Sequence, residues 1–212
     1  SEFMKKTIIN FGWDEDKIKV IYNFSEKMND KVSDKIEDYG LYFGRLSREK
    51  GIEVLLRALS LSDKKNKLKI IGTGPEENNL RKIVKDLKLS RRVNFLGYKS
   101  GQELQDIIRG ARLVYLPSTW NENMPLTLLE SLNLRKVVIA SKTGGLPELI
   151  KDKETGFLFE NGNIKELARI IDDSYNYDLI KMGLKAKESV ENLKIERHLI
   201  ELLDVYNYIL KE

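Results

Sequence analysis

Apolar residues follow two different spacings along this chain, and the two spacings alternate. Short runs such as LKIIG (68–72) and KVVIA (136–140) are apolar at nearly every position, which is typical of strands buried on both faces of a sheet. Longer stretches such as GIEVLLRALSL (51–61) carry apolar residues at helical spacing. Strands that alternate with helices in this way predict an α/β domain, with a parallel sheet and helices on both of its faces.

The alternation predicts most of the elements. Expected strands cover residues 17–23, 39–46, 68–72, 93–97, 112–117, 136–140 and 156–160. Expected helices cover residues 51–61, 76–89, 102–110, 125–134, 146–150 and most of 163–212. In sheets of this class, ligands bind at the carboxyl ends of the strands. Functional residues are therefore expected in the loops that lead from the strands into the helices.

The first such loop, GRLSREKG (44–51), carries cations. Gly44 ends the preceding strand, and Arg45 and Lys50 follow it before the next helix begins. Cations in this position can hold phosphate oxygens. The alternative is that they are ordinary surface charges.

Two further loops are rich in glycine. In IGTGPEENN (71–79), Gly74 allows a close approach of the backbone, to a ligand or in a tight turn. In SKTGGLPELI (141–150), Gly144 and Gly145 could admit a sugar or phosphate against bare backbone, or form only a turn. Both alternatives remain open for each loop.

The stretch WNENMPLTLLESL (120–132) contains the start of a helix. Pro125 suits the first helical position because its missing N–H would have no partner there. The N–H groups of Leu126 and Thr127 would then also lack helical partners. A helix start of this kind can bind an anion such as phosphate.

Two carboxylates flank that helix start. Glu122 lies in the preceding loop, and Glu130 lies four residues after Leu126 on the same side of the helix. A carboxylate can accept hydrogen bonds from two neighbouring hydroxyl groups, as a ribose or a hexose offers. The stretch would therefore suit a nucleotide sugar, and the alternative is that both glutamates are solvated charges.

Composition narrows the function classes. The 212 residues are 41% hydrophobic and 33% charged, which is typical of a globular domain with a charged surface. The net charge of +4 comes from interspersed cations and anions, whereas nucleic-acid binders carry a clustered basic excess. The absence of cysteine excludes thiolate metal sites, and a single histidine, His198, argues against a His-based zinc site. No apolar stretch approaches the ~18 residues of a membrane span.

The order of these loops resembles the C-terminal half of family-4 retaining glycosyltransferases, which have the GT-B architecture of two Rossmann-like domains. The resemblance covers about residues 17–165 and rests on GRL…KG, IGTGPE, VNFLG, PS…E with a second Glu eight positions later, and GGLPELI…TGFLF. The paired glutamates followed by Gly-Gly-x-Pro-Glu are its specific part. It implies an α/β fold with a Rossmann-like parallel sheet, one half of a GT-B fold.

The resemblance also implies roles for individual residues. Arg45 and Lys50 would hold the donor diphosphate and stabilise the charge that develops on it, and Glu122 would contact the hydroxyl groups of the donor sugar. Glu130 would hold the ribose, and the base would lie near Tyr98. The positions implied in donor binding, several of them through backbone amides, are Gly44, Gly74, Tyr98, Met124, Leu126, Thr127 and Glu130.

Two features of the sequence affect how closely these residues can be expected to act as their family counterparts do. Asn123, Met124 and Pro125 stand where many family members have small residues, and Pro125 has no N–H to donate, so the sugar contacts could differ in detail. Family members are thought to need no metal. The DED at residues 14–16 resembles a metal motif, but it precedes the sheet and fits a solvated turn better.

Family members also carry an N-terminal domain of comparable size, which binds the acceptor. Nothing before residue 17 could build such a domain, and SEFM (1–4) resembles a cloning scar. Residues 5–212 are therefore expected to form a single nucleotide-sugar-binding, Rossmann-like domain, with C-terminal helices in residues 163–212.

This interpretation predicts the donor-binding domain of a retaining glycosyltransferase that moves a sugar from a UDP-, GDP- or ADP-linked donor to an acceptor hydroxyl group. It expects no metal or other cofactor, no nucleic-acid partner and no activity without the N-terminal domain. The full-length protein is expected in the cytoplasm or peripheral to a membrane. The alternatives are another GT-B enzyme, such as a sugar-nucleotide epimerase, or a non-catalytic nucleotide-binding module.

Overall fold

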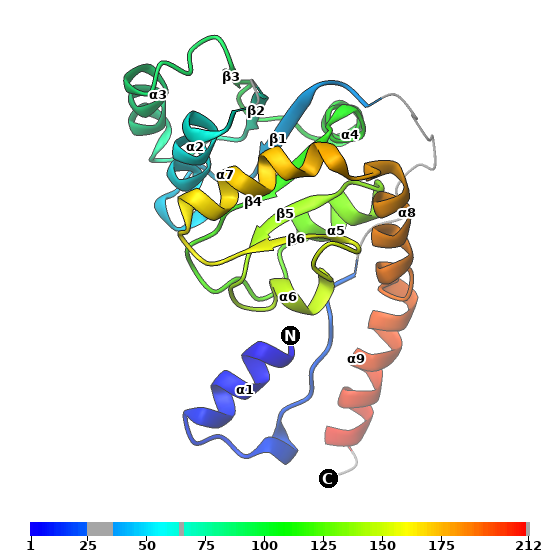
Figure 1. The fold of residues 1–212 in the computed structure, drawn as a ribbon. Coiled ribbons are helices and arrows are strands. Elements are labelled where there is room, and N and C mark those ends of the chain that lie inside the picture. The colour runs from blue at the N-terminus through cyan, green and yellow to red at the C-terminus, as the bar shows by residue number, and fades with distance from the viewer. Residues whose placement is uncertain (25–35, 64–65, 211–212) are drawn as a thin grey trace.

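The protein is built around one parallel sheet of six strands. The computed structural model describes residues 1–24, 36–63 and 66–210, and the sheet order is β3-β2-β1-β4-β5-β6 (Figure 1). Every strand pair in the sheet is parallel. The strands are β1 Tyr39–Phe43, β2 Lys67–Ile71, β3 Val93–Phe95, β4 Leu113–Leu116, β5 Val138–Ser141 and β6 Gly156–Phe159.

Helices connect the strands and continue beyond the last one. They are α1 Glu2–Asn10, α2 Ile52–Leu61, α3 Glu77–Asp86, α4 Gly101–Gly110, α5 Leu126–Asn133, α6 Leu146–Leu149, α7 Ile164–Asp173, α8 Leu179–Val190 and α9 Ile195–Ile209. Short 3₁₀ helices cover Glu15–Lys17 (η1), Arg48–Lys50 (η2) and Ser174–Asn176 (η3). None of the helices that the structure describes is both long enough and apolar enough to cross a lipid bilayer.

Two hydrophobic cores lie on opposite faces of the sheet. Leu68 and Ile70 belong to the core that includes α2, α3 and α7. Leu41, Phe43 and Val138 belong to the core that includes α4, α5 and α8. Successive side chains of a strand point to opposite faces, so strands that are apolar throughout supply both cores. The α/β, Rossmann-like fold class expected from the sequence is confirmed.

The strand expected at residues 17–23 does not form. Residues 18–24 run outside the sheet and pair with none of its six strands. The alternating pattern of this segment fits an extended chain, but a strand also needs a neighbour at hydrogen-bonding distance. Its polar groups contact loops instead: Asn23 Nδ2 donates to the carbonyl oxygen of Met124 at 2.9 Å.

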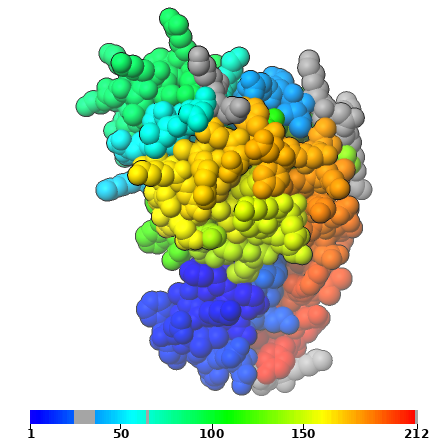
Figure 2. Space-filling model, in the orientation of Figure 1, coloured from blue at the N-terminus to red at the C-terminus, as the bar shows by residue number. Residues whose placement is uncertain are grey.

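Helix α1 was not expected from the sequence. Ser1 caps it, because its side-chain oxygen accepts from the N–H of Met4 at 3.2 Å, and residues 2–4 are helical. Residues 1–4 thus form the N-cap and the first turn of this helix, and the interpretation of these residues as a cloning scar stays a prediction. Helices α1 and α9 extend away from the sheet on the same side of the molecule (Figures 1 and 2).

A buried lysine closes the end of α4. The ammonium group of Lys136 donates to the carbonyl oxygens of Arg109 and of Ala111, the latter at 3.1 Å. Lys136 is 6% exposed, and this burial lowers the pKa of its side chain to about 8. The lysine supplies donors to carbonyl groups that the helix end leaves without partners.

We predict that Lys136→Met lowers the free energy of unfolding by about 1–3 kcal/mol, because buried carbonyl groups lose their donor. The pKa is lower in the folded than in the unfolded state, so between pH 8 and about 10.4 the unfolded chain binds more protons. The parent protein should therefore gain stability over that range relative to the variant. Urea unfolding of both proteins at pH 7.5 and 9.5 measures this, and an unchanged difference between the two would contradict the predicted pH dependence.

Candidate functional site

The four loops singled out in the sequence meet at the carboxyl edge of the sheet. The N–H of Leu46, after β1, donates to the carbonyl oxygen of Thr73, after β2, at 2.9 Å. The N–H of Thr119, after β4, donates to the carbonyl oxygen of Glu49 at 2.8 Å. The N–H of Gly145, after β5, donates to the carbonyl oxygen of Glu122 at 2.7 Å. Backbone hydrogen bonds thus join all four loops.

The glycine pair after β5 is needed for this contact. A Cβ atom on Gly144 would lie 1.9 Å from the carbonyl oxygen of Glu122, and one on Gly145 would lie 2.1 Å from that of Asn123. Gly144 also has a φ of +57°, which residues with a side chain rarely adopt. Both glycines therefore let the loop after β4 rest directly on the backbone of the loop after β5.

Gly74 plays the same part between two other loops. A Cβ atom on Gly74 would lie 2.3 Å from the carbonyl oxygen of Leu46. The neighbouring N–H of Glu76 donates to that same oxygen at 2.9 Å. Of the alternatives left open by the sequence, a structural role in loop packing accounts for these contacts, and a ligand contact by Gly74 remains a prediction.

Lys50 and Glu122 form an ion pair at the centre of the loop cluster. Lys50 Nζ lies 2.7 Å from Glu122 Oε1, and the two residues are 72 positions apart in the chain. The hydroxyl of Ser118 donates to the same Oε1 at 2.7 Å. The side chains of Lys50 and Glu122 are only 30% and 14% exposed. The structure therefore brings together two residues that the sequence assigned to one site, and their catalytic roles remain predictions.

A buried tyrosine of β1, Tyr42, holds the backbone of the loop at residues 44–51. The hydroxyl of Tyr42 donates to the carbonyl oxygen of Arg45 at 2.8 Å. Burial raises the pKa of Tyr42, and the negative charges of Glu122 and Glu49 raise it further, so the hydroxyl stays protonated. The sequence analysis missed this residue, because nothing in its strand pattern distinguishes it from core.

The predicted residues differ in how much they offer to a ligand. Arg45 and Tyr98 are exposed, and in residues 1–24, 36–63 and 66–210 the guanidinium of Arg45 has no ion-pair partner. Gly44 is partly exposed where β1 ends. Met124 is 6% exposed and its side chain belongs to the core, so any contact it makes with a ligand must come from its backbone.

Helix α5 begins one residue later than the sequence predicted. Pro125 is the N-cap, with an extended backbone (φ −70°, ψ 134°), and the helix starts at Leu126. The carbonyl of Pro125 accepts from the N–H of Leu128 at 3.0 Å. Within the described part of the chain, the N–H groups of Leu126 and Thr127 meet no acceptor, so the helix start retains two free donors. Glu130 follows on the same helix.

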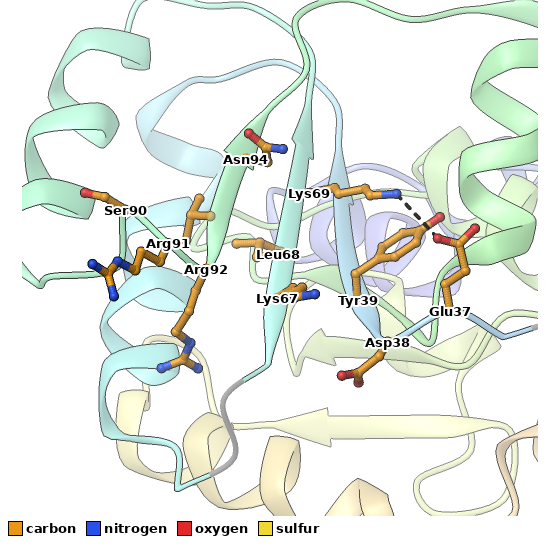
Figure 3. A pocket seen from close by; sticks show the side chains of 11 residues that line it. Glu37, Asp38, Tyr39, Lys67, Leu68, Lys69, Ser90, Arg91, Arg92 and Asn94 are labelled. Carbon is orange, nitrogen blue, oxygen red and sulfur yellow. Dashed lines mark ion pairs between the residues drawn. The ribbon is translucent and has the colours of Figure 1, made fainter.

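A separate pocket lies at the opposite edge of the sheet. Its volume is about 380 Å³, and it surrounds the amino ends of β1, β2 and β3 (Figure 3). One of its lysines already has partners. Lys69 Nζ lies 3.9 Å from Glu37 Oε2 and 3.5 Å from the ring centroid of Tyr39. Ligands of parallel α/β sheets bind at the carboxyl edge, so the loop cluster is the stronger candidate site.

Within residues 1–24, 36–63 and 66–210, no group of three or more His, Asp or Glu side chains is arranged to hold a metal ion. The carboxylate of Glu122 is already paired with the ammonium group of Lys50, which makes it a poor ligand for a metal ion.

Comparison with known proteins identifies the family. The model of the family described as "Glycosyl transferases group 1" matches residues 23–194. The chain belongs to this family. An uncharacterized glycosyltransferase of Methanocaldococcus jannaschii is 32% identical over 222 residues, which cover 92% of this chain and 57% of that protein.

Several solved structures share the fold. A complex of Staphylococcus aureus TarM with fondaparinux, α-GlcNAc-glycerol and UDP has a TM-score of 0.86 and 28% identity, and the match covers 98% of this chain and 43% of TarM. A complex of Anabaena HepE with UDP-glucose has a TM-score of 0.79 at 22% identity, with 98% and 61% of the chains covered. This group 1 chain spans about half the length of the curated relatives it matches.

We predict that Gly144→Ala displaces the loop after β4 and lowers the free energy of unfolding by about 1–3 kcal/mol more than Gly162→Ala. Gly162 is the matched control, because its φ is also positive (+74°) but a Cβ there would meet nothing within 4 Å. The difference between the two variants therefore isolates the contact with Glu122. Chemical denaturation measures it, and equal losses in both variants would show that backbone strain alone matters.

Proposed function

We propose that this group 1 chain is the donor-binding domain of a retaining, family-4-type glycosyltransferase, and that it binds a nucleotide diphospho-sugar at the carboxyl edge of the sheet. The observation that carries the proposal is the Lys50–Glu122 pair together with the start of α5, four residues after Glu122, where the N–H groups of Leu126 and Thr127 meet no acceptor among the residues that the structure describes. Family membership supports it, as does the presence of UDP in the TarM complex and of UDP-glucose in the HepE complex.

In this proposal the diphosphate is held by cations and amides together. Arg45 and Lys50 supply positive charge from the loop after β1, and the N–H groups of Leu126 and Thr127 supply donors at a helix start. As the bond to the sugar breaks, negative charge grows on the leaving diphosphate. Donors and cations fixed in advance stabilise that charge without reorganising, so transfer needs no metal ion.

Glu122 would hold the donor sugar through its second oxygen. Lys50 and Ser118 both contact Oε1. Oε2 is then left to accept hydrogen bonds from sugar hydroxyl groups.

Glu130 and Tyr98 would serve the nucleoside. Glu130 lies one helical turn after Leu126 on α5, so its carboxylate can lie near a ribose whose phosphate is held at the helix start. Tyr98 is 72% exposed and follows β3, where an aromatic ring could lie against the base. UDP-, GDP- and ADP-linked sugars all fit this description.

We further propose that the active enzyme contains a second, acceptor-binding domain. The curated relatives are about twice as long as this chain, and α9 and the turn after α1 expose many large apolar side chains. These are Phe11, Trp13, Ile195, Leu199, Ile200, Leu203, Tyr206, Tyr208 and Ile209. Such a surface is typical of one that another domain covers. Alone, the chain should bind donor but transfer no sugar, and the whole protein would work in the cytoplasm or at a membrane surface.

We predict that Lys50→Ala and Glu130→Gln weaken binding by different routes. A charge-assisted hydrogen bond contributes about 1.5–3 kcal/mol. Each change should therefore lower the affinity for ligands that carry the group contacted by that residue by roughly 10- to 150-fold. Loss of Lys50 should affect nucleoside diphosphates far more than nucleosides. Loss of the Glu130 carboxylate should affect ribonucleotides and spare 2′,3′-dideoxy analogues.

Calorimetric titration with UDP, GDP, ADP and their sugar conjugates measures these effects, in EDTA so that any metal requirement is exposed. Lys67→Ala is the matched control, because Lys67 is an exposed lysine at the amino edge of the sheet. If no nucleotide binds at millimolar concentration, or if both site variants bind as the parent does, the proposal is wrong. Sugar transfer by the isolated chain would contradict the need for a second domain.

A further inference from the structure

One carboxylate receives three hydrogen bonds from the N-terminal arm, which we define as residues 1–24. Oε2 of Glu148 accepts from the N–H of Glu2 at 3.0 Å and from the hydroxyl of Tyr22 at 2.8 Å. Oε1 of Glu148 accepts from the N–H of Phe3 at 2.7 Å. Glu148 lies in α6, in the segment after β5. It therefore holds both the beginning and the end of the arm at one point.

These contacts are chemically favourable. Glu2 and Phe3 are the first residues of α1, where N–H groups lack helical partners and a negative charge is stabilised. Burial and the bond to Glu148 raise the pKa of Tyr22 to about 12, so its hydroxyl remains a donor at neutral pH. Hydrogen bonds to an ionised acceptor are about twice as strong as neutral ones.

The arm also contacts the loop that carries Glu122. The hydroxyl of Ser1 donates to Oδ1 of Asn123 at 2.6 Å. Asn23 donates from Nδ2 to the carbonyl oxygen of Met124 at 2.9 Å. The two residues that follow Glu122 are thus each held by one end of the arm.

The same loop is held from the sheet side by other groups. Lys50 and Ser118 hold the side chain of Glu122, and the N–H of Gly145 holds its carbonyl oxygen. The loop is therefore clamped between the sheet and the arm. On the arm side, the carboxylate of Glu148 joins the two ends of the arm, and His198 Nδ1 lies 2.8 Å from the carbonyl oxygen of Tyr22.

We propose that Glu148 is a positioning residue for the sugar end of the donor site. It anchors the arm, and the arm in turn fixes Asn123 and Met124, so that Glu122 stays in the geometry that binds the donor sugar. Glu148 itself touches the arm and not the donor. The proposal rests on the proposed function for its ligand, whereas the coupling between arm and loop can be measured without any ligand.

The coupling is tested by amide hydrogen exchange in the whole chain carrying Glu148→Ala, Glu148→Gln or Tyr22→Phe. The N–H of Gly145 reports on the loop, because its acceptor is the carbonyl of Glu122. Its exchange should be about ten-fold faster in Glu148→Ala, where three charge-assisted bonds are lost. It should rise less in Glu148→Gln, which keeps an acceptor oxygen, and least in Tyr22→Phe, which removes one bond of the three.

Glu166→Ala is the matched control. The carboxylate of Glu166 accepts from the N–H of Glu160 at 2.8 Å and from Nδ2 of Asn163 at 3.2 Å, at the start of α7. This variant also removes a carboxylate from a helix start, but it leaves the arm untouched. It should lower the melting temperature without speeding exchange at Gly145. Unchanged exchange at Gly145 in both Glu148→Ala and Tyr22→Phe, or an equal rise in the control, overturns the proposal.

The ligand side is tested by titrating each variant with UDP-glucose and with UDP. Glu148→Ala should weaken UDP-glucose by roughly three- to ten-fold and UDP by less than about two-fold, because only the sugar end depends on the loop. Equal weakening of both ligands overturns the assignment to the sugar end. If the parent binds no nucleotide sugar while exchange at Gly145 still responds, the proposed function fails and the coupling of arm and loop stands. If the Glu148 variants do not fold, Tyr22→Phe carries both measurements.

Discussion

The candidate site depends on how closely the loops at the carboxyl edge of the sheet approach each other. Gly144 and Gly145 lie so near the backbone of Glu122 and Asn123 that neither position has room for a Cβ atom. Gly74 meets the loop after β1 in the same way. Because the loops touch through backbone, the main chains that carry Lys50 and Glu122 are held close together, and their side chains meet across that gap.

The ion pair between Lys50 and Glu122 has a further effect on the site. Each partner would be costly to leave unpaired in a partly buried position, and the contact removes that cost before any ligand arrives. The two charges therefore orient each other, and groups oriented in advance cost a ligand less to bind. Tyr42 also holds the loop after β1. Its hydroxyl donates to the carbonyl oxygen of Arg45, and the side chain of Arg45 stays exposed.

The sequence was sufficient for the sheet because strands buried on both faces leave a plain apolar signature. It failed for residues 17–23, where the pattern predicted a strand but could not show that no other strand lies beside this segment. The family resemblance implied that Glu122 and Lys50 belong to one donor site, but the contact between them spans 72 positions and no local pattern specifies it. Glu148 was noticed only as part of a glycine-rich motif. Its partners, Glu2, Phe3 and Tyr22, are far away in the chain, and the tertiary structure alone brings them together.

The strand order has a consequence for how this site can change. The order β3-β2-β1-β4-β5-β6 reverses direction between β1 and β4, so the chain leaves these two adjacent strands towards opposite faces. The helices that follow these strands therefore lie on opposite faces, while the two loops meet at the carboxyl edge, where the N–H of Thr119 donates to the carbonyl oxygen of Glu49. Loop side chains at this point can change while the strand order that places the loops stays the same. In folds with this topological switch point, substitutions in the loops can thus change the ligand while the sheet and its strand order stay the same.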